Sequence, residues 1–182
     1  MHLSAGQPSE PALMVVMGVS GCGKSTIAAA LAEKWGAAYL DADEYHPPAN
    51  IAKMSQGEAL NDTDRWPWLK HFGQAMAAQN VSQSAPCIGA CSALKRSYRT
   101  ALTAAAAQPI LFIHLDGSRA LLSERITARS DHFMPPALLD SQLNTLEAPT
   151  ADDEYALTVD ISGTPEQIVA WIMQQLGNNG RT

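Results

Sequence analysis

The stretch GVSGCGKS, residues 18–25, decides the fold of this 182-residue chain. It fits the pattern G-x-x-x-x-G-K-[ST] and stands between the apolar run 13–19 and the helix-forming segment STIAAALAEKW, as a phosphate-binding loop requires. Its glycines let backbone N–H groups approach phosphate oxygens. Its lysine reaches the β- and γ-phosphates, and its serine ligates Mg²⁺. The sequence therefore predicts an ATP site with bound Mg²⁺, formed by Gly18, Val19, Ser20, Gly21, Cys22, Gly23, Lys24, Ser25 and Thr26.

Short apolar runs alternate with helix-forming segments on both sides of this loop. We expect strands at 13–19, 37–41, 86–92, 109–116 and 156–162. Helices are expected at 25–35, 50–54, 62–80, 94–107, 118–129, 137–147 and 164–177. Pro67 is compatible with its helix only in the first turn. The alternation predicts an α/β fold in three layers, a parallel five-stranded sheet flanked by helices. One domain is expected over 12–177, with a flexible leader 1–11 and a flexible tail 178–182.

Composition excludes several classes of function. With 12 basic against 18 acidic residues the formal net charge is −6, which disfavours a nucleic-acid partner. The three cysteines show neither CxxC nor Cys/His finger spacing, so no disulfide framework or zinc site is predicted. The first residues lack the order of a signal peptide, and no apolar run approaches the roughly 20 residues that span a bilayer. We therefore expect a cytoplasmic protein without a membrane partner.

Two aspartates follow the second expected strand, in the sequence YLDADEYHPP. Alternate side chains of an extended strand point the same way, so we expect Asp41 and Asp43 to face one cleft. Asp41, together with Ser25, is the candidate Mg²⁺ ligand. Asp43 is the candidate catalytic base or orienting residue, because a carboxylate one step further out can accept the proton of an attacking hydroxyl and direct that hydroxyl at the γ-phosphorus.

Other classes of phosphate-loop protein fit less well. The NKxD sequence of a GTPase is absent. Asp116 ends an apolar strand as the metal-binding aspartate of a motor or transporter ATPase does, but we interpret it as a loop or helix-capping residue.

Further blocks make a resemblance specific. DADEYHPPANIAKM, DRWPWL, ACSALKRSYR, RITARSDHFM and LLDSQLNTLEAP follow the phosphate loop in an order that resembles the gluconokinase family of small P-loop kinases, over about residues 16–161. The resemblance implies a P-loop kinase fold with a mobile lid and ATP-dependent phosphorylation of D-gluconate at its 6-hydroxyl, a step of carbohydrate catabolism. The sequence departs from the family pattern at Asp131, where glycine is frequent, and at Thr100, where aspartate is usual.

Gluconate is an anionic chain of hydroxyl groups, so its site needs a cation and several hydrogen-bonding side chains. Arginine suits a carboxylate because its planar fork binds both oxygens. The candidate substrate residues are Asp43, His46, Lys53, Arg65, Arg96, Arg99 and His132.

Arg125 and Arg129 lie four residues apart, on one face of an expected helix. They lead into SDHFMPP, where the periodicity breaks. Related kinases carry a mobile lid here, so we expect a lid at about 125–136. Lys24, Asp43, Arg125 and Arg129 are then the catalytic set, with the two lid arginines offsetting charge on the transferred phosphoryl group.

Alternatives remain open at this point. A kinase for another small hydroxy acid such as shikimate is possible, although that family usually has a run of glycines where this chain reads ACSALK. A nucleotide-binding module without turnover is a second alternative. A homodimer is common in the resembling family, and adenine contacts are expected from late loops near 160–164.

Overall fold

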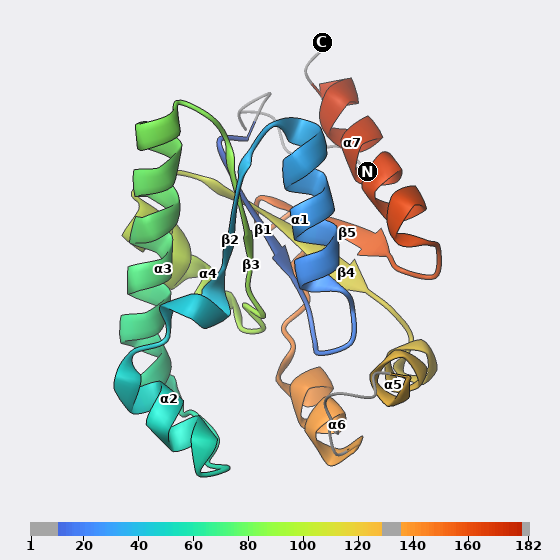
Figure 1. Ribbon diagram of the computed structural model, residues 1–182. Helices are drawn as coiled ribbons and strands as arrows, with labels where there is room; N and C mark the ends of the chain where they lie inside the picture. Colours follow the sequence, from blue (N-terminus) through green and yellow to red (C-terminus); the bar gives the residue numbers. More distant parts are fainter. Residues whose placement is uncertain (1–10, 129–135, 180–182) are drawn as a thin grey trace.

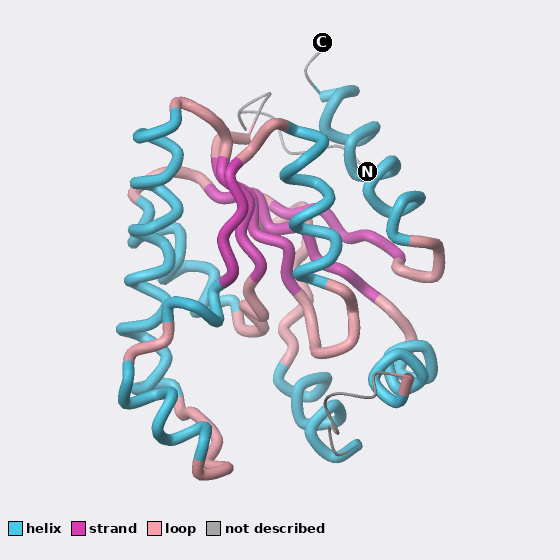
Figure 2. The backbone as a smooth tube through the Cα atoms, viewed as in Figure 1, coloured by secondary structure: helices cyan, strands magenta, loops and turns pink. Residues whose placement is uncertain are grey.

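The computed structural model describes residues 11–128 and 136–179. Its centre is one sheet of five parallel strands in the order β2-β3-β1-β4-β5, enclosed by helices (Figures 1 and 2). The strands are β1 (Leu13–Met17), β2 (Ala38–Asp41), β3 (Cys87–Ala90), β4 (Ile110–Asp116) and β5 (Ala156–Asp160). This confirms the predicted α/β class and the number of strands. No helix among the described residues is both long and apolar enough to cross a membrane.

Strand β1 is buried along its whole length because both of its faces carry apolar side chains. Met14 and Val16 point into one core and Leu13 and Val15 into the other, as the two-residue period of a strand requires. A fully apolar run such as LMVVM therefore indicates a central strand covered on both faces.

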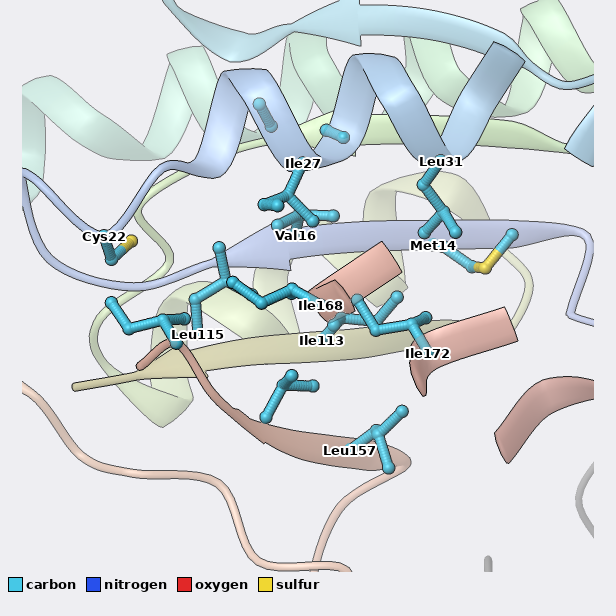
Figure 3. Close-up of a cluster of buried hydrophobic side chains, with 14 of the residues drawn as sticks. Met14, Val16, Cys22, Ile27, Leu31, Ile113, Leu115, Leu157, Ile168 and Ile172 are labelled. Atoms are coloured by element: carbon cyan, nitrogen blue, oxygen red, sulfur yellow. The ribbon is translucent and has the colours of Figure 1, made fainter. Parts of the chain in front are cut away.

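Helices cover the two faces of the sheet, which makes three layers. Helix α1 (Lys24–Trp35) and helix α7 (Pro165–Asn179) cover one face, with Ile27, Ile168 and Ile172 in the core (Figure 3). The opposite face is covered by α3 (Asp62–Gln83) and α4 (Arg96–Ala106). These two helices approach closely at Gly73, where an added Cβ would lie 2.7 Å from the Leu102 carbonyl oxygen.

The remaining helices lie beyond the carboxyl ends of the strands (Figure 1). They are the 3₁₀ helix η1 (Ala42–Tyr45), α2 (Pro48–Ser55), α5 (Arg119–Thr127) and α6 (Pro136–Thr145). Ligands of open parallel sheets bind at this edge, so these elements surround the candidate site.

Local details differ from the sequence expectations. Pro67 is the sixth residue of α3 rather than part of its first turn. Strand β1 ends at Met17, two residues earlier than expected, because the phosphate loop begins there. Residues 1–10 of the predicted leader, 180–182 of the predicted tail and 129–135 of the predicted lid lie outside the described part of the chain.

Candidate functional site

The phosphate loop connects β1 to α1 and depends on three glycines with positive φ. Gly18, Gly21 and Gly23 have φ values of 143°, 83° and 93°, which L side chains rarely adopt. Space is also limited, since a Cβ on Gly21 would lie 2.7 Å from Ile126 of α5. No side chain caps the N-terminus of α1 and its first turn has no acidic residue. Its amides are therefore available to an anion.

The polar side chains of the loop are in place for phosphate and metal. Lys24 Nζ lies 3.1 Å from the Val19 carbonyl oxygen. Ser25 Oγ donates to Asp41 Oδ2 over 3.0 Å, and Tyr39 donates to the same oxygen over 3.0 Å. A hydroxyl and a carboxylate fit Mg²⁺, which takes few protein ligands and fills its shell with phosphate oxygens and water. The described residues contain no cluster of three or more His, Cys, Asp or Glu that would suggest an all-protein metal cage.

Cys22 faces the interior although it belongs to the loop. Its side chain is 1% exposed and packs in the core beside Leu115 (Figure 3). Burial raises the pKa of this thiol, and the nearby Lys24 lowers it by less. Cys22 is thus a protonated core residue, and only its backbone is available to a phosphate.

Asp43 does not continue strand β2. The strand ends at Asp41, whose Oδ1 accepts from the Asp43 N–H over 3.1 Å and so starts η1. The expectation that both aspartates alternate along one strand is therefore wrong. The Asp43 carboxylate is 89% exposed at the sheet edge and lies 3.9 Å from His46 Nε2. Such a carboxylate is accessible to an incoming hydroxyl.

His46 is held against the aromatic face of α3. Its ring stacks on Trp68 with centroids 4.2 Å apart, and Trp68 Nε1 donates to the Ala42 carbonyl over 2.6 Å. Burial lowers the pKa of His46, an effect that Asp43 opposes and Arg65 reinforces. His46 is therefore neutral at pH 7 and offers ring nitrogens for hydrogen bonds to neutral groups.

A cluster of charged and polar side chains from α2, α3 and the start of α4 is here called the acceptor wall; it consists of Lys53, Asp62, Asp64, Arg65, Lys95 and Tyr98. Lys53 Nζ binds Asp64 Oδ2 at 2.7 Å. Asp64 also closes a capping box with Asn61 at the start of α3. Lys53 is thus fixed by a side chain that has a structural task of its own.

The second cluster of the acceptor wall gathers around Asp62. Lys95 Nζ lies 2.9 and 3.1 Å from its two carboxylate oxygens, and Tyr98 donates to Oδ1 over 2.5 Å. Arg65 Nη1 lies 3.4 Å from Asp62 and 3.3 Å from the Tyr98 hydroxyl. The hydrogen bonds from Tyr98 and Lys95 lower the pKa of Asp62. Two cations and a hydroxyl thus converge on one carboxylate.

Arg96 and Arg99, the arginines predicted to bind substrate, lie on a different face of α4 from Tyr98. Arg99 is 1% exposed, and Nε and Nη2 each lie 2.6 Å from the Glu154 carboxylate. Its remaining donors bind the carbonyls of Ala93, Leu94 and Glu147. Every N–H of the Arg99 guanidinium is thus engaged inside the protein. Arg99 therefore has a structural role and offers no donor to a substrate.

Arg96 is exposed, and its guanidinium donates to the Asp153 carbonyl over 3.3 Å. It lines a cavity of about 620 Å³, and Phe112 and Tyr155 are also part of the lining. Thr100, one of the two departures from the family pattern, lines the same cavity, and its hydroxyl bonds the Arg96 carbonyl. The other departure, Asp131, lies outside the described residues.

Arg125 lies beside the phosphate loop. Its Nη2 donates to the Ile161 carbonyl over 2.7 Å, and it lines a pocket of about 300 Å³ with Gly21, Gly23, Thr26 and Pro165. Ile161 belongs to the late segment expected to contact adenine. Arg129 and His132 lie outside the described residues, as does most of the predicted lid. Asp116 is the exposed last residue of β4, and the side chain that caps α5 is that of Ser118.

Comparison with known proteins assigns this geometry to a family. The AAA domain family profile matches residues 13–149. A probable gluconokinase of Schizosaccharomyces pombe is 45% identical over 85% of this chain and 82% of its own length. A gluconokinase of Gluconobacter oxydans is 44% identical over 88% of both chains. The crystal structure of a gluconokinase from Sinorhizobium meliloti superposes with a TM-score of 0.81 at 43% identity, over 92% of this chain and 93% of that one.

The chain belongs to the gluconokinase family.

Within this gluconokinase fold, sequence reasoning missed Tyr39, Asp62, Lys95 and Tyr98. Lys95 and Tyr98 stand in the block CSALKRSYR that carried the resemblance, next to the arginines chosen instead. Lys95 is the N-cap residue of α4 and Tyr98 lies in its first turn, and their spacing of three was the available signal. Asp62 begins α3, where the helix dipole alone explains an acidic residue.

Proposed function

We propose that this protein transfers the γ-phosphoryl group of ATP to the 6-hydroxyl of D-gluconate, giving 6-phospho-D-gluconate and ADP. The observation that carries the proposal is the Ser25–Asp41 pair in front of the phosphate loop, with the exposed Asp43 carboxylate next to it. Family membership supports gluconate as the acceptor. A binding module without turnover would have no need of the exposed carboxylate, and family membership favours gluconate over shikimate, which also carries a carboxylate and hydroxyl groups.

Transfer is proposed to occur in line. The gluconate O6 forms a bond to the γ-phosphorus while the bond from that phosphorus to the ADP oxygen breaks. Asp43 accepts the proton of the 6-hydroxyl. Lys24 and the loop amides bind phosphate oxygens and offset their developing charge. Ser25 and Asp41 would hold Mg²⁺, which when bound neutralises phosphate charge.

The acceptor wall is proposed to bind the gluconate chain. Lys95, Arg65 and Tyr98 suit its carboxylate, because they already surround the carboxylate of Asp62. His46, which lies 3.9 Å from Asp43, and Lys53, which binds Asp64, suit the hydroxyls. Arg96 stays a weaker candidate, because its side chain lines the separate cavity behind α4.

The nucleoside of ATP is proposed to occupy the pocket lined by Thr26, Arg125 and Pro165. Its volume of about 300 Å³ opens directly beside the phosphate loop. Arg125 is proposed to act here on the nucleotide. Arg129 and His132 are kept as proposed contributors from the lid, to the phosphoryl group and to the substrate respectively.

An assay of ADP release with Mg²⁺ and ATP tests the function, with D-gluconate, shikimate, AMP or no acceptor. We expect turnover with gluconate alone and phosphate on its terminal oxygen, which NMR of the product identifies. Turnover on shikimate or AMP alone would refute the acceptor. ATP binding without turnover on any of them would favour a binding module. We further propose a cytoplasmic location and a homodimer, the latter to be measured by light scattering.

A further inference from the structure

A side chain from α6 reaches the phosphate loop. Gln142 Oε1 accepts from the backbone N–H of Ser20 over 2.7 Å, across 122 residues of sequence. This N–H belongs to a loop whose function is to present amides to phosphate, yet here it is directed at a neutral side chain. Figure 1 shows α6 just beyond the loop that joins β1 to α1.

The bond to Gln142 fixes a peptide group that also holds Lys24. The Ser20 N–H and the Val19 carbonyl belong to the same peptide, and that carbonyl accepts from Lys24 Nζ over 3.1 Å. In a trans peptide the N–H and C=O point to opposite sides, so Gln142 and Lys24 hold this group from two directions. Hydrogen bonds at both ends of a peptide also polarise it and strengthen one another.

Gln142 is itself held in position by both ends of its segment. On one side, Asp140 forms two bonds of 2.6 and 2.9 Å with Arg119 of α5. On the other, the Glu147 N–H donates to the Leu94 carbonyl over 2.9 Å, and the Glu147 carboxylate accepts from the Arg96 N–H over 2.7 Å. The helix that presents Gln142 is thus attached both to α5 and to the loop before α4. A side chain presented in this way is preorganised.

We propose that Gln142 is a positioning residue for nucleotide binding. It sets the orientation of the Val19–Ser20 peptide and, through its carbonyl, the position of the Lys24 ammonium that meets the β- and γ-phosphates. Without Gln142 this peptide loses the hydrogen bond to its N–H, and its orientation rests on the contacts of the Val19 carbonyl with Lys24 Nζ and the Cys22 N–H, at 3.1 and 3.4 Å. The inference rests on the proposed ATP site. Through Gln142, α6, the helix after the predicted lid, then affects how tightly the loop binds phosphate.

The test is the Kd of Mg-ATP for Gln142→Met and Gln142→Ala. Methionine keeps the length and helix propensity but removes the acceptor, so loss of one hydrogen bond is expected to weaken ATP about tenfold. Asn144→Ala, an exposed change on the same helix, is the matched control and is expected to leave the Kd unchanged. Equal thermal unfolding midpoints for all variants exclude a folding effect. An unchanged Kd in Gln142→Met would overturn the proposal.

A double-mutant cycle separates positioning from direct contact. ATP binding is measured by NMR titration, which reaches weak affinities, for Lys24→Ala with and without Gln142→Met. If Gln142 acts through Lys24, its substitution has no further effect once Lys24 is absent. The same tenfold loss in both backgrounds would show that Gln142 acts by another route and would refute the mechanism. Failure of the unsubstituted protein to bind ATP would instead refute the proposed function.

Discussion

The phosphate loop and the acceptor wall are built in opposite ways. The loop is one stretch of nine residues whose geometry comes from three glycines and a helix N-terminus. The acceptor wall takes its side chains from α2, α3 and the start of α4, and ion pairs hold them in place. A local site depends on backbone conformation. A dispersed site depends on the packing that brings its pieces together, so the two respond differently to substitution.

The largest effect is expected where packing supports the dispersed site. Arg99→Leu leaves the Glu154 carboxylate, which is 14% exposed, without its partner. Breaking a buried ion pair typically costs about 3–5 kcal/mol in the free energy of unfolding. Chemical denaturation measures this cost. Arg96→Leu, an exposed change one helical turn away, is the matched control and should stay within about 0.5 kcal/mol.

The double variant Arg99→Leu/Glu154→Leu sharpens this prediction. It removes both charges, so it should recover much of the lost stability. Equal instability of the single and double variants would mean that the packing of the arginine stem, rather than its charge, holds α4 to the segment before β5.

Substitution of Asp43 tests the proposed proton transfer between the phosphate loop and the acceptor wall. Asp43→Ala is expected to lower kcat by at least about 10²-fold, because a general base contributes on that scale. The Kd of ATP should be unchanged, since the Asp43 carboxylate is 89% exposed and is proposed to act on the acceptor hydroxyl. Steady-state kinetics measures the change in kcat. The control is Glu44→Ala, because Glu44 is the exposed neighbour of Asp43 in η1. Retained turnover would contradict the role of Asp43.

Substitution of Lys95 tests whether the acceptor wall binds the carboxylate of the substrate. Lys95→Met should raise the KM for gluconate about tenfold, the scale of a hydrogen bond to a charged group, and leave the KM for ATP unchanged. Lys70→Met on the exposed face of α3 is the matched control. A shared rise in both KM values would indicate damage to the fold instead of a lost substrate contact.

The smallest effect concerns His114, on β4 opposite Met17, the last residue before the loop. It is 2% exposed and its Nδ1 has no hydrogen-bond partner among the described residues. Burial lowers its pKa, which Asp116 opposes and Arg99 reinforces. The unfolded state therefore binds a proton at this histidine near pH 6.5, whereas the folded state binds it only at lower pH. As a result, the free energy of unfolding falls as the pH drops below 6.5.

At pH 5.5 this loss is at most about 1.4 kcal/mol. His114→Asn should reduce the difference in unfolding free energy between pH 7.5 and pH 5.5. His46 titrates with the same sign but is present in both proteins, so comparing them isolates His114. The same pH dependence with and without His114 would contradict the argument.

Much of this molecule could be predicted from local patterns. The apolar run of β1, the glycines and lysine of the loop, and the alternation of strands and helices each reflect interactions within a few residues. Fold class and strand number were therefore correct. Strand ends were less accurate: β1, β3 and β5 each end two residues earlier than expected, because the loops that follow them begin there.

Residue roles were harder to predict when they depend on which face of a helix meets which neighbour. Arg96 and Arg99 were chosen for the substrate because arginine binds carboxylates, yet Arg99 satisfies a carboxylate of the protein itself. Lys95 and Tyr98, next to them in sequence, are the residues that face α3 and Asp62.

The sequence by itself determined the phosphate loop, the parallel sheet and the likeness to the gluconokinase family, because glycine conformations and apolar periodicity act over short distances. Only the tertiary structure decided that Lys95 contacts Asp62 while Arg99 contacts Glu154, and that Gln142 reaches Ser20. These contacts join residues that lie far apart along the chain, and the packing of whole helices on the sheet sets their distances.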